Sequence, residues 1–134
     1  MTRRRSLRST KNVVYSCLYH VVFCPKYRRP VLVVGVAERL KEIVATTAEA
    51  FSATILEMAV LPDQVQLLVE VDPQFGIHRL VKQIKGHSSQ LLRNKFPALR
   101  RRLPTLWTNS YFVATVGGVP LAIVKQYIEN QKQV

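Results

Sequence analysis

Two glutamines on one face of an expected strand are the first residues with the potential for chemistry. Residues 64–71 read QVQLLVEV, and the side-chain alternation of a strand places Gln64 and Gln66 on the face opposite the apolar series. Glutamine is a poor strand former, and its amide costs free energy if it is buried without a hydrogen-bond partner. A pair at i and i+2 therefore requires a partner, a ligand or solvent.

A tyrosine near the C-terminus is the candidate for covalent chemistry. Tyr127 and Gln131 stand one turn apart on an expected helix, beside an apolar side formed by Leu121, Val124 and Ile128. A phenol in that position can be a nucleophile, but an isolated tyrosine near a helix end also fits an amphipathic surface. The residues alone leave both interpretations open.

Uncompensated positive charge marks a candidate binding surface. The chain of 134 residues has 20 Lys and Arg against 8 Asp and Glu, a formal charge of +12, and no acidic residue lies between Asp72 and Glu129. Such a region attracts a polyanion, which predicts nucleic acid as the partner. A solvated basic face and an anionic membrane surface are the alternatives. The predicted phosphate contacts are Lys82, Lys85, Arg100, Arg101 and Arg102.

Regular hydrophobic patterns identify the elements that must position these residues. Alternating or continuous apolar runs predict strands, and apolar residues spaced by three and four predict helices. The expected order is a strand at 13–24, a helix at 35–51, strands at 53–61 and 64–71 joined by a turn at Pro62-Asp63, a helix at 77–95, a basic loop at 98–104, a strand at 110–116 and a helix from Pro120 onward. This order predicts an α+β fold, a ferredoxin-like or RRM-like βαββαβ antiparallel sheet with helices on one face, plus a C-terminal tyrosine-bearing helix.

The length of the chain and its two cysteines predict the domain organisation and the cellular compartment. A chain of this size fits one domain at 1–134, with a basic N-terminal arm at 1–12 and the tyrosine helix at 119–134. No stretch approaches the roughly 18 apolar residues of a membrane span. Cys17 and Cys24 lie about 23 Å apart on an extended strand, too far to pair. Two free thiols predict a cytoplasmic protein, and the Arg-rich start leaves an organellar presequence as the alternative.

Several segments together resemble a known family, the small single-tyrosine HUH transposases of prokaryotic insertion sequences, called TnpA. The segments are YHVVFCPKYRRPVL from Tyr19, LPDQVQLLVE from Leu61, KQIKGHSS from Lys82, LWTNSYFVATVGG from Leu106 and VKQYIENQ from Val124. The resemblance implies a homodimeric single-stranded DNA transposase that cuts and rejoins hairpin-bearing element ends through a 5′-phosphotyrosine. It also implies Tyr127 as the nucleophile and a divalent metal, Mg²⁺ or Mn²⁺, held at positions 64, 66 and 131.

The sequence departs from this family at two of the metal positions. The family hairpin reads PDHVHLLV, whereas this chain has Gln64 and Gln66 in place of the two histidines. A neutral amide oxygen is a weaker ligand than an imidazole nitrogen, so the resemblance implies weak or absent metal binding and impaired or lost cleavage. The chain is then a deliberately inactivated sequence, a natural copy that survives for its DNA binding, or an enzyme with a glutamine-rich metal site.

Two other classes of function stay open at this point. One is a non-catalytic nucleic-acid-binding module of RRM-like fold, although no segment matches the aromatic RNP consensus. The other is a homodimeric structural or regulatory protein, in which no activity depends on Tyr127.

Overall fold

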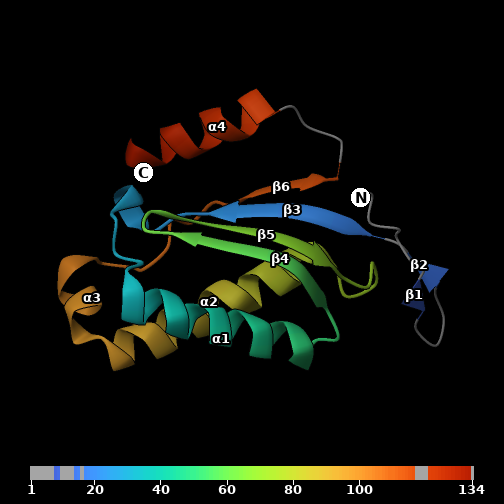
Figure 1. Ribbon diagram of the computed structural model, residues 1–134, viewed down its shortest axis with the longest axis horizontal. Coiled ribbons are helices and arrows are strands. Elements are labelled where there is room, and N and C mark those ends of the chain that lie inside the picture. The colour runs from blue at the N-terminus through green and yellow to red at the C-terminus, as the bar shows by residue number, and fades with distance from the viewer. Residues whose placement is uncertain (1–7, 10–13, 16, 117–120, 134) are drawn as a thin grey trace.

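A four-stranded antiparallel sheet is the centre of the molecule. The structure is a computed structural model that describes residues 8–9, 14–15, 17–116 and 121–133 (Figure 1). The sheet has the strand order β4-β5-β3-β6. Its strands are β3 (Leu18–Phe23), β4 (Thr54–Leu61), β5 (Gln64–Glu70) and β6 (Phe112–Thr115). A separate two-stranded ladder joins β1 (Arg8–Ser9) to β2 (Val14–Tyr15).

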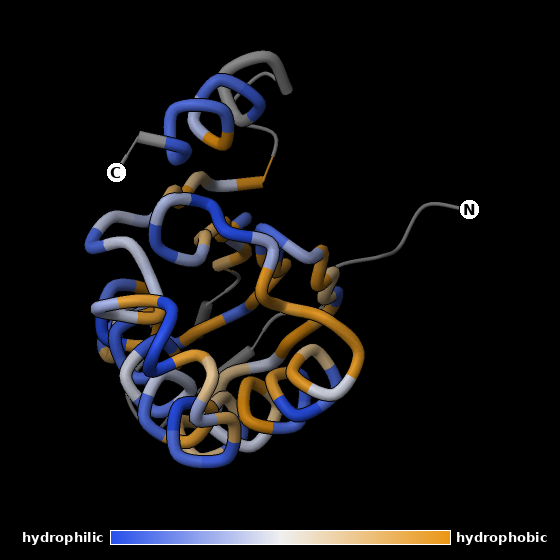
Figure 2. Tube along the Cα trace, turned by 90° about the vertical axis from the view of Figure 1, so that its left-hand side faces the viewer, coloured by the Kyte–Doolittle hydropathy of each residue, from blue (hydrophilic) through white to orange (hydrophobic). Residues whose placement is uncertain are grey.

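Helices lie on both sides of this sheet. α1 (Val34–Ala50), α2 (Ile77–Lys95) and the short α3 (Pro97–Arg102) form one layer, and α4 (Leu121–Asn130) lies on the opposite side (Figure 1). The view at right angles shows the same separation, with α4 and the C-terminus at the top and the helix layer at the bottom (Figure 2). Two 3₁₀ turns, η1 (Lys26–Arg28) and η2 (Gln131–Gln133), complete the described elements. The predicted βαββαβ order with an added C-terminal helix is confirmed.

The hydrophobic core lies between the sheet and the α1–α2 layer. One face of β3 and β5 enters it, and helix residues at spacings of three and four meet that face. The fully buried members include Val21, Phe23, Val65, Val69, Leu40, Val44, Leu80 and Ile84. This face of β5 is the apolar series that alternation predicts, so the even-numbered residues of β5 face the α4 side.

Trp107 fixes the segment that leads from the helix layer to β6. Its ring packs edge-on against Phe23 at 4.7 Å, and its Nε1 donates a hydrogen bond to Ser88 Oγ at 3.0 Å. The indole and this serine are both buried, so the loop after α3 is tied to α2 by apolar and polar contacts together. These contacts therefore fix the position at which the chain leaves Trp107 toward β6.

Two predicted elements differ from the structure. The strand expected at 13–24 is divided, because β2 pairs with β1 and only Leu18–Phe23 joins the main sheet. The basic loop expected at 98–104 begins as α3, since Pro97 occupies the first turn of a helix, where its missing N–H costs nothing, and Leu99 is buried.

Other sequence predictions concern residues at the edges of the described chain. Most of the arm at 1–12, the Gly117-Gly118 pair and Pro120 lie outside the described residues, so the division into arm, body and tyrosine helix stays a prediction. Both cysteines are free thiols, as expected, and Cys24 is buried. Among the described helices, none has the length and apolar character needed to span a membrane.

Candidate functional site

The candidate site occupies the face of the sheet that the α1–α2 layer does not cover. Gln66 lies opposite Val22 in the ladder, and Val22 lies opposite Phe112, so these three residues form one row across β5, β3 and β6. Gln64 lies two residues before Gln66 on the same face. Residues from three strands thus form the floor of the site.

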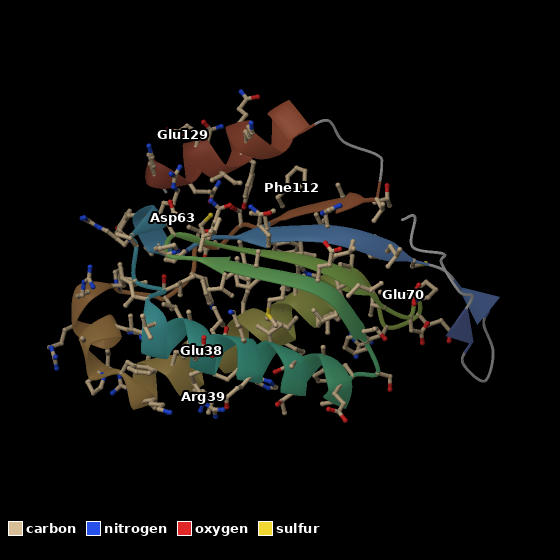
Figure 3. The ribbon with its side chains drawn as sticks, in the orientation of Figure 1. Glu38, Arg39, Asp63, Glu70, Phe112 and Glu129 are labelled. Atoms are coloured by element: carbon tan, nitrogen blue, oxygen red, sulfur yellow. The ribbon has the colours of Figure 1, made fainter. Side chains whose placement is uncertain are left out.

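α4 brings Tyr127 and Gln131 over this floor. The Tyr127 ring lies 5.5 Å from the Phe112 ring, which sits between β6 and α4 (Figure 3). Ser110 Oγ is 2.9 Å from the Tyr127 hydroxyl and donates to Gln131 Oε1 at 3.4 Å. Gln131 Nε2 donates back to the Tyr127 carbonyl at 3.2 Å. The two helix residues and Ser110 form one hydrogen-bonded cluster.

The strand glutamines and this cluster share one side of the sheet. Neighbouring strands lie about 4.8 Å apart, so about 10 Å separates Gln66 from Phe112 beneath the tyrosine. The structure therefore brings Gln64, Gln66, Tyr127 and Gln131 to the same face. A hollow of about 290 Å³ beside Gln131 is lined by Lys26, Thr108, Asn109, Ser110, Asn130 and Gln131.

The three glutamine amides do not fit a resident divalent cation. Gln66 Nε2 donates to Gln64 Oε1 at 2.8 Å, and Gln131 Oε1 accepts from Ser110. Two of the three candidate ligand oxygens are thus engaged by protein donors, and all three are neutral. Hard divalent cations favour carboxylates among their ligands. Within the described part of the chain, no cluster of three His, Cys, Asp or Glu offers another set.

Burial controls the protonation of two groups near the site. Burial raises the pKa of the Tyr127 phenol above its usual value, the hydrogen bond with Ser110 opposes this, and the nearby Cys24 adds to it. Burial, followed by the charge of Asp63, raises the pKa of the Cys24 thiol to about 11. The phenol and the thiol both keep their protons at neutral pH.

An arginine from η1 attaches the end of α4 to the body of the protein. Arg28 Nε donates to Asp63 Oδ2 at 2.7 Å, and its Nη1 donates to Ile128 O at 3.3 Å and Glu129 Oε2 at 3.2 Å. Asp63 is at the turn between β4 and β5, below the end of α4 that carries Glu129 (Figure 3). Burial alone lowers the pKa of Arg28, but the bonds to the two carboxylates outweigh it and leave the pKa raised.

The candidate phosphate-binding cations lie on the helix layer. Lys82 is exposed on α2, and Arg100, Arg101 and Arg102 are exposed on α3. Because α2 rises 1.5 Å per residue, about 20 Å separates Lys82 from the end of the helix that leads to α3. Lys85 differs from the others, since its ammonium donates to three backbone carbonyls. The structure thus places these cations along one layer and not in one compact cluster.

A groove beside Lys82 was not evident from the sequence. It has a volume of about 320 Å³ and is lined by His78, Lys82, Lys85, Gly86, Ser89, Thr105, Trp107, Thr108, Asn109 and Tyr111. His78 stacks on Tyr111 and hydrogen-bonds to its hydroxyl. The walls of the groove come from α2 and from the segment before β6, two parts of the chain that sequence periodicity does not connect.

Ser110 and Arg28 were also not predicted from the sequence as residues of the site. Ser110 is 17 residues from Tyr127, and Arg28 is 101 residues from Glu129. The one available signal was their occurrence within two of the segments that carried the family resemblance, at 106–118 and 19–32.

Comparison with known proteins gives a consistent family. The family model described as "Transposase IS200 like" matches residues 13–131. The ISDra2 transposase TnpA of Deinococcus radiodurans is 36% identical over 127 residues, covering 93% of this chain and 91% of the relative. The transposase for insertion sequence element IS200 of Salmonella typhimurium is 31% identical over 133 residues, covering 98% and 85%. The crystal structure of a candidate transposase from Deinococcus radiodurans R1 superposes with a TM-score of 0.83 at 36% identity, covering 95% of this chain and 99% of that one.

Proposed function

Because the chain belongs to the IS200-like transposase family, we propose that it binds single-stranded, hairpin-bearing DNA as a homodimer and that Tyr127 is its nucleophile. One observation carries this proposal. Tyr127 and Gln131 on the C-terminal helix lie over the same sheet face as Gln64 and Gln66, the positions that the family resemblance assigns to metal ligands. A tyrosine on an unrelated amphipathic surface would have no reason to share that face.

The reaction is a transesterification. The Tyr127 oxygen attacks a backbone phosphorus and forms a phosphotyrosine bond to the 5′ side, while the bond from phosphorus to the 3′ oxygen breaks. The proton lost by the phenol is matched by the proton that the released 3′ oxygen takes up. Ser110 Oγ, at 2.9 Å from the Tyr127 hydroxyl, forms a hydrogen bond with it that orients the phenol.

The amides at positions 64 and 66 impair this chemistry. A phenol whose pKa is raised by burial is a weak nucleophile, so the reaction depends on charge stabilisation at the phosphate. Gln64 and Gln66 hydrogen-bond to each other and carry no charge, so they supply little of it. We therefore expect DNA binding to persist and cleavage to be mostly lost.

DNA binding without any cleavage is the second candidate function. The hydrogen bond from Gln66 to Gln64 favours it, because it satisfies these amides without a metal. This alternative predicts no covalent protein–DNA product under any condition. Residual cleavage by the unmodified chain would therefore separate the two candidates.

Binding is tested by fluorescence anisotropy with a labelled single-stranded hairpin and a blunt duplex of equal length. Lys82, Arg100, Arg101 and Arg102 are the four exposed candidate contacts, since Lys85 is occupied by carbonyls. Each phosphate contact to a single strand contributes about 0.7 to the log–log salt slope, so we expect a slope near about −3 and tighter binding to the hairpin. A flat salt response, or equal affinity for the duplex, would contradict the proposal.

A charge-matched pair of variants locates the binding surface. Arg101→Gln removes one cation from α3, and we expect the salt slope to fall by about 0.7. The control is Lys41→Gln, an exposed lysine of α1 that lies between Glu38 and Glu42 in the sequence. Equal effects of the α3 variant and the α1 control would place the DNA elsewhere.

A further inference from the structure

We propose that Lys85 is a positioning residue that holds the Tyr127 hydroxyl in place through the backbone of residues 108–110. The inference rests on the proposed role of Tyr127 as nucleophile. Lys85 belongs to α2, on the helix layer, whereas Tyr127 belongs to α4, on the other side of the sheet (Figure 1). The segment before β6 connects the two.

The ammonium of Lys85 caps that segment. Its Nζ donates to Thr108 O at 2.6 Å and to Ser110 O at 3.1 Å, and it lies 3.4 Å from Asn109 O. An ammonium has three donors, so these three successive carbonyls use its full capacity. The lysine thereby fixes the path of the backbone at residues 108–110.

The fixed segment carries the group that touches the tyrosine. Ser110 Oγ is 2.9 Å from the Tyr127 hydroxyl and bonds to Gln131 Oε1. A displacement of the Ser110 backbone by even 1 Å would break the hydroxyl contact, because hydrogen bonds weaken steeply beyond their normal length. Lys85 thus acts on Tyr127 through Ser110 and touches no reacting atom.

The surroundings of Lys85 favour this role over a phosphate contact. Its ammonium lies 5.6 Å from the centre of the Tyr111 ring, and its hydrogen-bond partners are carbonyls, not carboxylates. Burial lowers its pKa to about 8, and the neighbouring Cys24 opposes this shift. The other titratable groups around it are Tyr111 and, on its own helix, His78 and Lys82, which line the same groove.

The lowered pKa of Lys85 makes the positioning role measurable in solution. Below pH 8 the charged amine holds all three carbonyls, and above pH 8 the neutral amine loses a donor and the charge that attracts them. The environment of Tyr127 should therefore change around pH 8, well below the titration of its own phenol, whose pKa is raised above 10.

The test is nuclear magnetic resonance of protein labelled with ¹³C at the tyrosine ζ carbon, with no DNA present. The Tyr127 signal is assigned by its loss in Tyr127→Phe. We expect this signal to shift between pH 7 and pH 9 with a midpoint near 8. In Lys85→Arg, whose guanidinium stays charged at every pH used, we expect the signal to stay at one position from pH 7 to pH 9.

Two further variants complete the test. Lys85→Met should give the displaced signal at every pH, and Lys95→Met should behave as the unmodified protein, since that lysine lies over the Phe96 ring at the far end of α2. A Tyr127 signal that is flat from pH 7 to 9, or a midpoint that persists in Lys85→Arg, would overturn the proposal. If Lys85→Met does not fold, the Lys85→Arg comparison still decides.

The absence of DNA separates this inference from the proposed function. If the Tyr127 signal depends on Lys85 but no variant forms a covalent DNA product, Lys85 positions Tyr127 and the nucleophile assignment fails. If a covalent product forms at Tyr127 but the Tyr127 signal does not depend on Lys85, the nucleophile assignment holds and the positioning role fails.

Discussion

Two amides decide the chemistry of the sheet face at the scale of single residues. Gln64 and Gln66 stand side by side on β5, and each satisfies part of the other's hydrogen-bonding capacity. Imidazoles at the same two positions would present nitrogen atoms that bind transition-metal cations. Under the proposed function, glutamine in place of histidine at these positions alters the chemistry of the exposed face of β5, while the opposite face of the strand is buried in the core.

The sequence predicted part of this site at the residue scale. Strict alternation in β5 was enough to place Gln64 and Gln66 on one face, and the helical repeat was enough to place Gln131 one turn beyond Tyr127. It could not predict the contact of Ser110 with Tyr127 or that of Lys85 with the backbone of Ser110, because these contacts join positions 17 and 25 residues apart. Local periodicity contains no information about such contacts.

Cys24 provides a prediction at this scale. Its thiol is buried beside Asp63 and has a pKa of about 11, whereas Cys17 is half-buried. Only the thiolate reacts with alkylating agents, so at pH 8 we expect iodoacetamide to modify Cys17 and to leave Cys24 unmodified until urea unfolds the protein. Peptide mass spectrometry over a time course measures both. Equal rates for the two cysteines in the folded protein would show that Cys24 is not buried as described.

The attachment of α4 is the main question at the scale of elements. Its tyrosine is held by ring contact with Phe112 and by Ser110, and its end is held by Arg28. Arg28 and Tyr27 both have positive φ angles, of 51° and 59°, a region that costs free energy for residues with a Cβ. The strain at η1 is retained because the arginine reaches Asp63 and α4 from that position.

Removal of this arginine should loosen α4. Arg28→Ala breaks charge-assisted hydrogen bonds that are partly exposed, so we expect a loss of about 1–2 kcal/mol in the local stability of the helix. The corresponding increase in amide exchange is roughly 5–30-fold for residues 121–133. Hydrogen–deuterium exchange with mass spectrometry measures it.

A matched control exists on α1. Arg39 pairs with Glu42 at 3.1 Å, an exposed i,i+3 pair within one helix, so Arg39→Ala should leave exchange in 121–133 unchanged. A similar effect from both variants, or no effect from Arg28→Ala, would show that Arg28 does not hold α4.

Acid should weaken the same attachment. The hydrogen bonds from Lys132 and then Arg28 lower the pKa of Glu129 below its ordinary value of 4.5. A lowered carboxyl pKa contributes stability that is present above the unfolded-state pKa and is lost as pH falls through the folded-state pKa. We therefore expect exchange in 121–133, after correction for the intrinsic rate, to rise as the pH falls below the ordinary Glu value of 4.5. In Glu129→Gln this part of the pH dependence should disappear, and its persistence there would assign it to another group.

Sequence patterns predicted the long helices and main strands but missed two features of the shorter elements. The four main strands and the two long helices were predicted because their apolar spacings extend over many residues. The helical start of 97–102 was missed, since three consecutive arginines suggest a solvated loop and the helix depends on Pro97 at its first turn and on the burial of Leu99. The break before β3 was missed because Val14 and Tyr15 have strand propensity in either sheet.

Oligomeric state is the prediction at the scale of the whole molecule. The family resemblance implies a homodimer, and β6 is an edge strand with Val113 and Val116 exposed at or beside it. An edge strand with apolar side chains is a surface that a second chain can cover. We expect multi-angle light scattering to give about twice the 15.3 kDa chain mass at tens of micromolar. A monomer mass with and without DNA would contradict this prediction.

The combination of a basic helix layer and an amide-substituted sheet face is the central feature of the whole molecule. The proposed function is that the chain keeps the DNA binding of a transposase and lacks most of its cleavage. The most direct measurement compares covalent protein–DNA product, on a denaturing gel with single-stranded hairpin DNA and Mn²⁺, between the unmodified chain and Gln64→His with Gln66→His. Loss of a single outer-shell partner of a metal ligand costs about 10–100-fold, so loss of both ligands should slow product formation by at least about 100-fold.

We predict abundant product from the double variant, little from either single variant, and none when Tyr127→Phe is added, with hairpin binding unchanged throughout. Phenylalanine keeps the ring that packs on Phe112 and removes only the attacking oxygen. Product from the unmodified chain at a rate equal to or above that of the double variant would show that the amides are working ligands and would contradict the loss of cleavage.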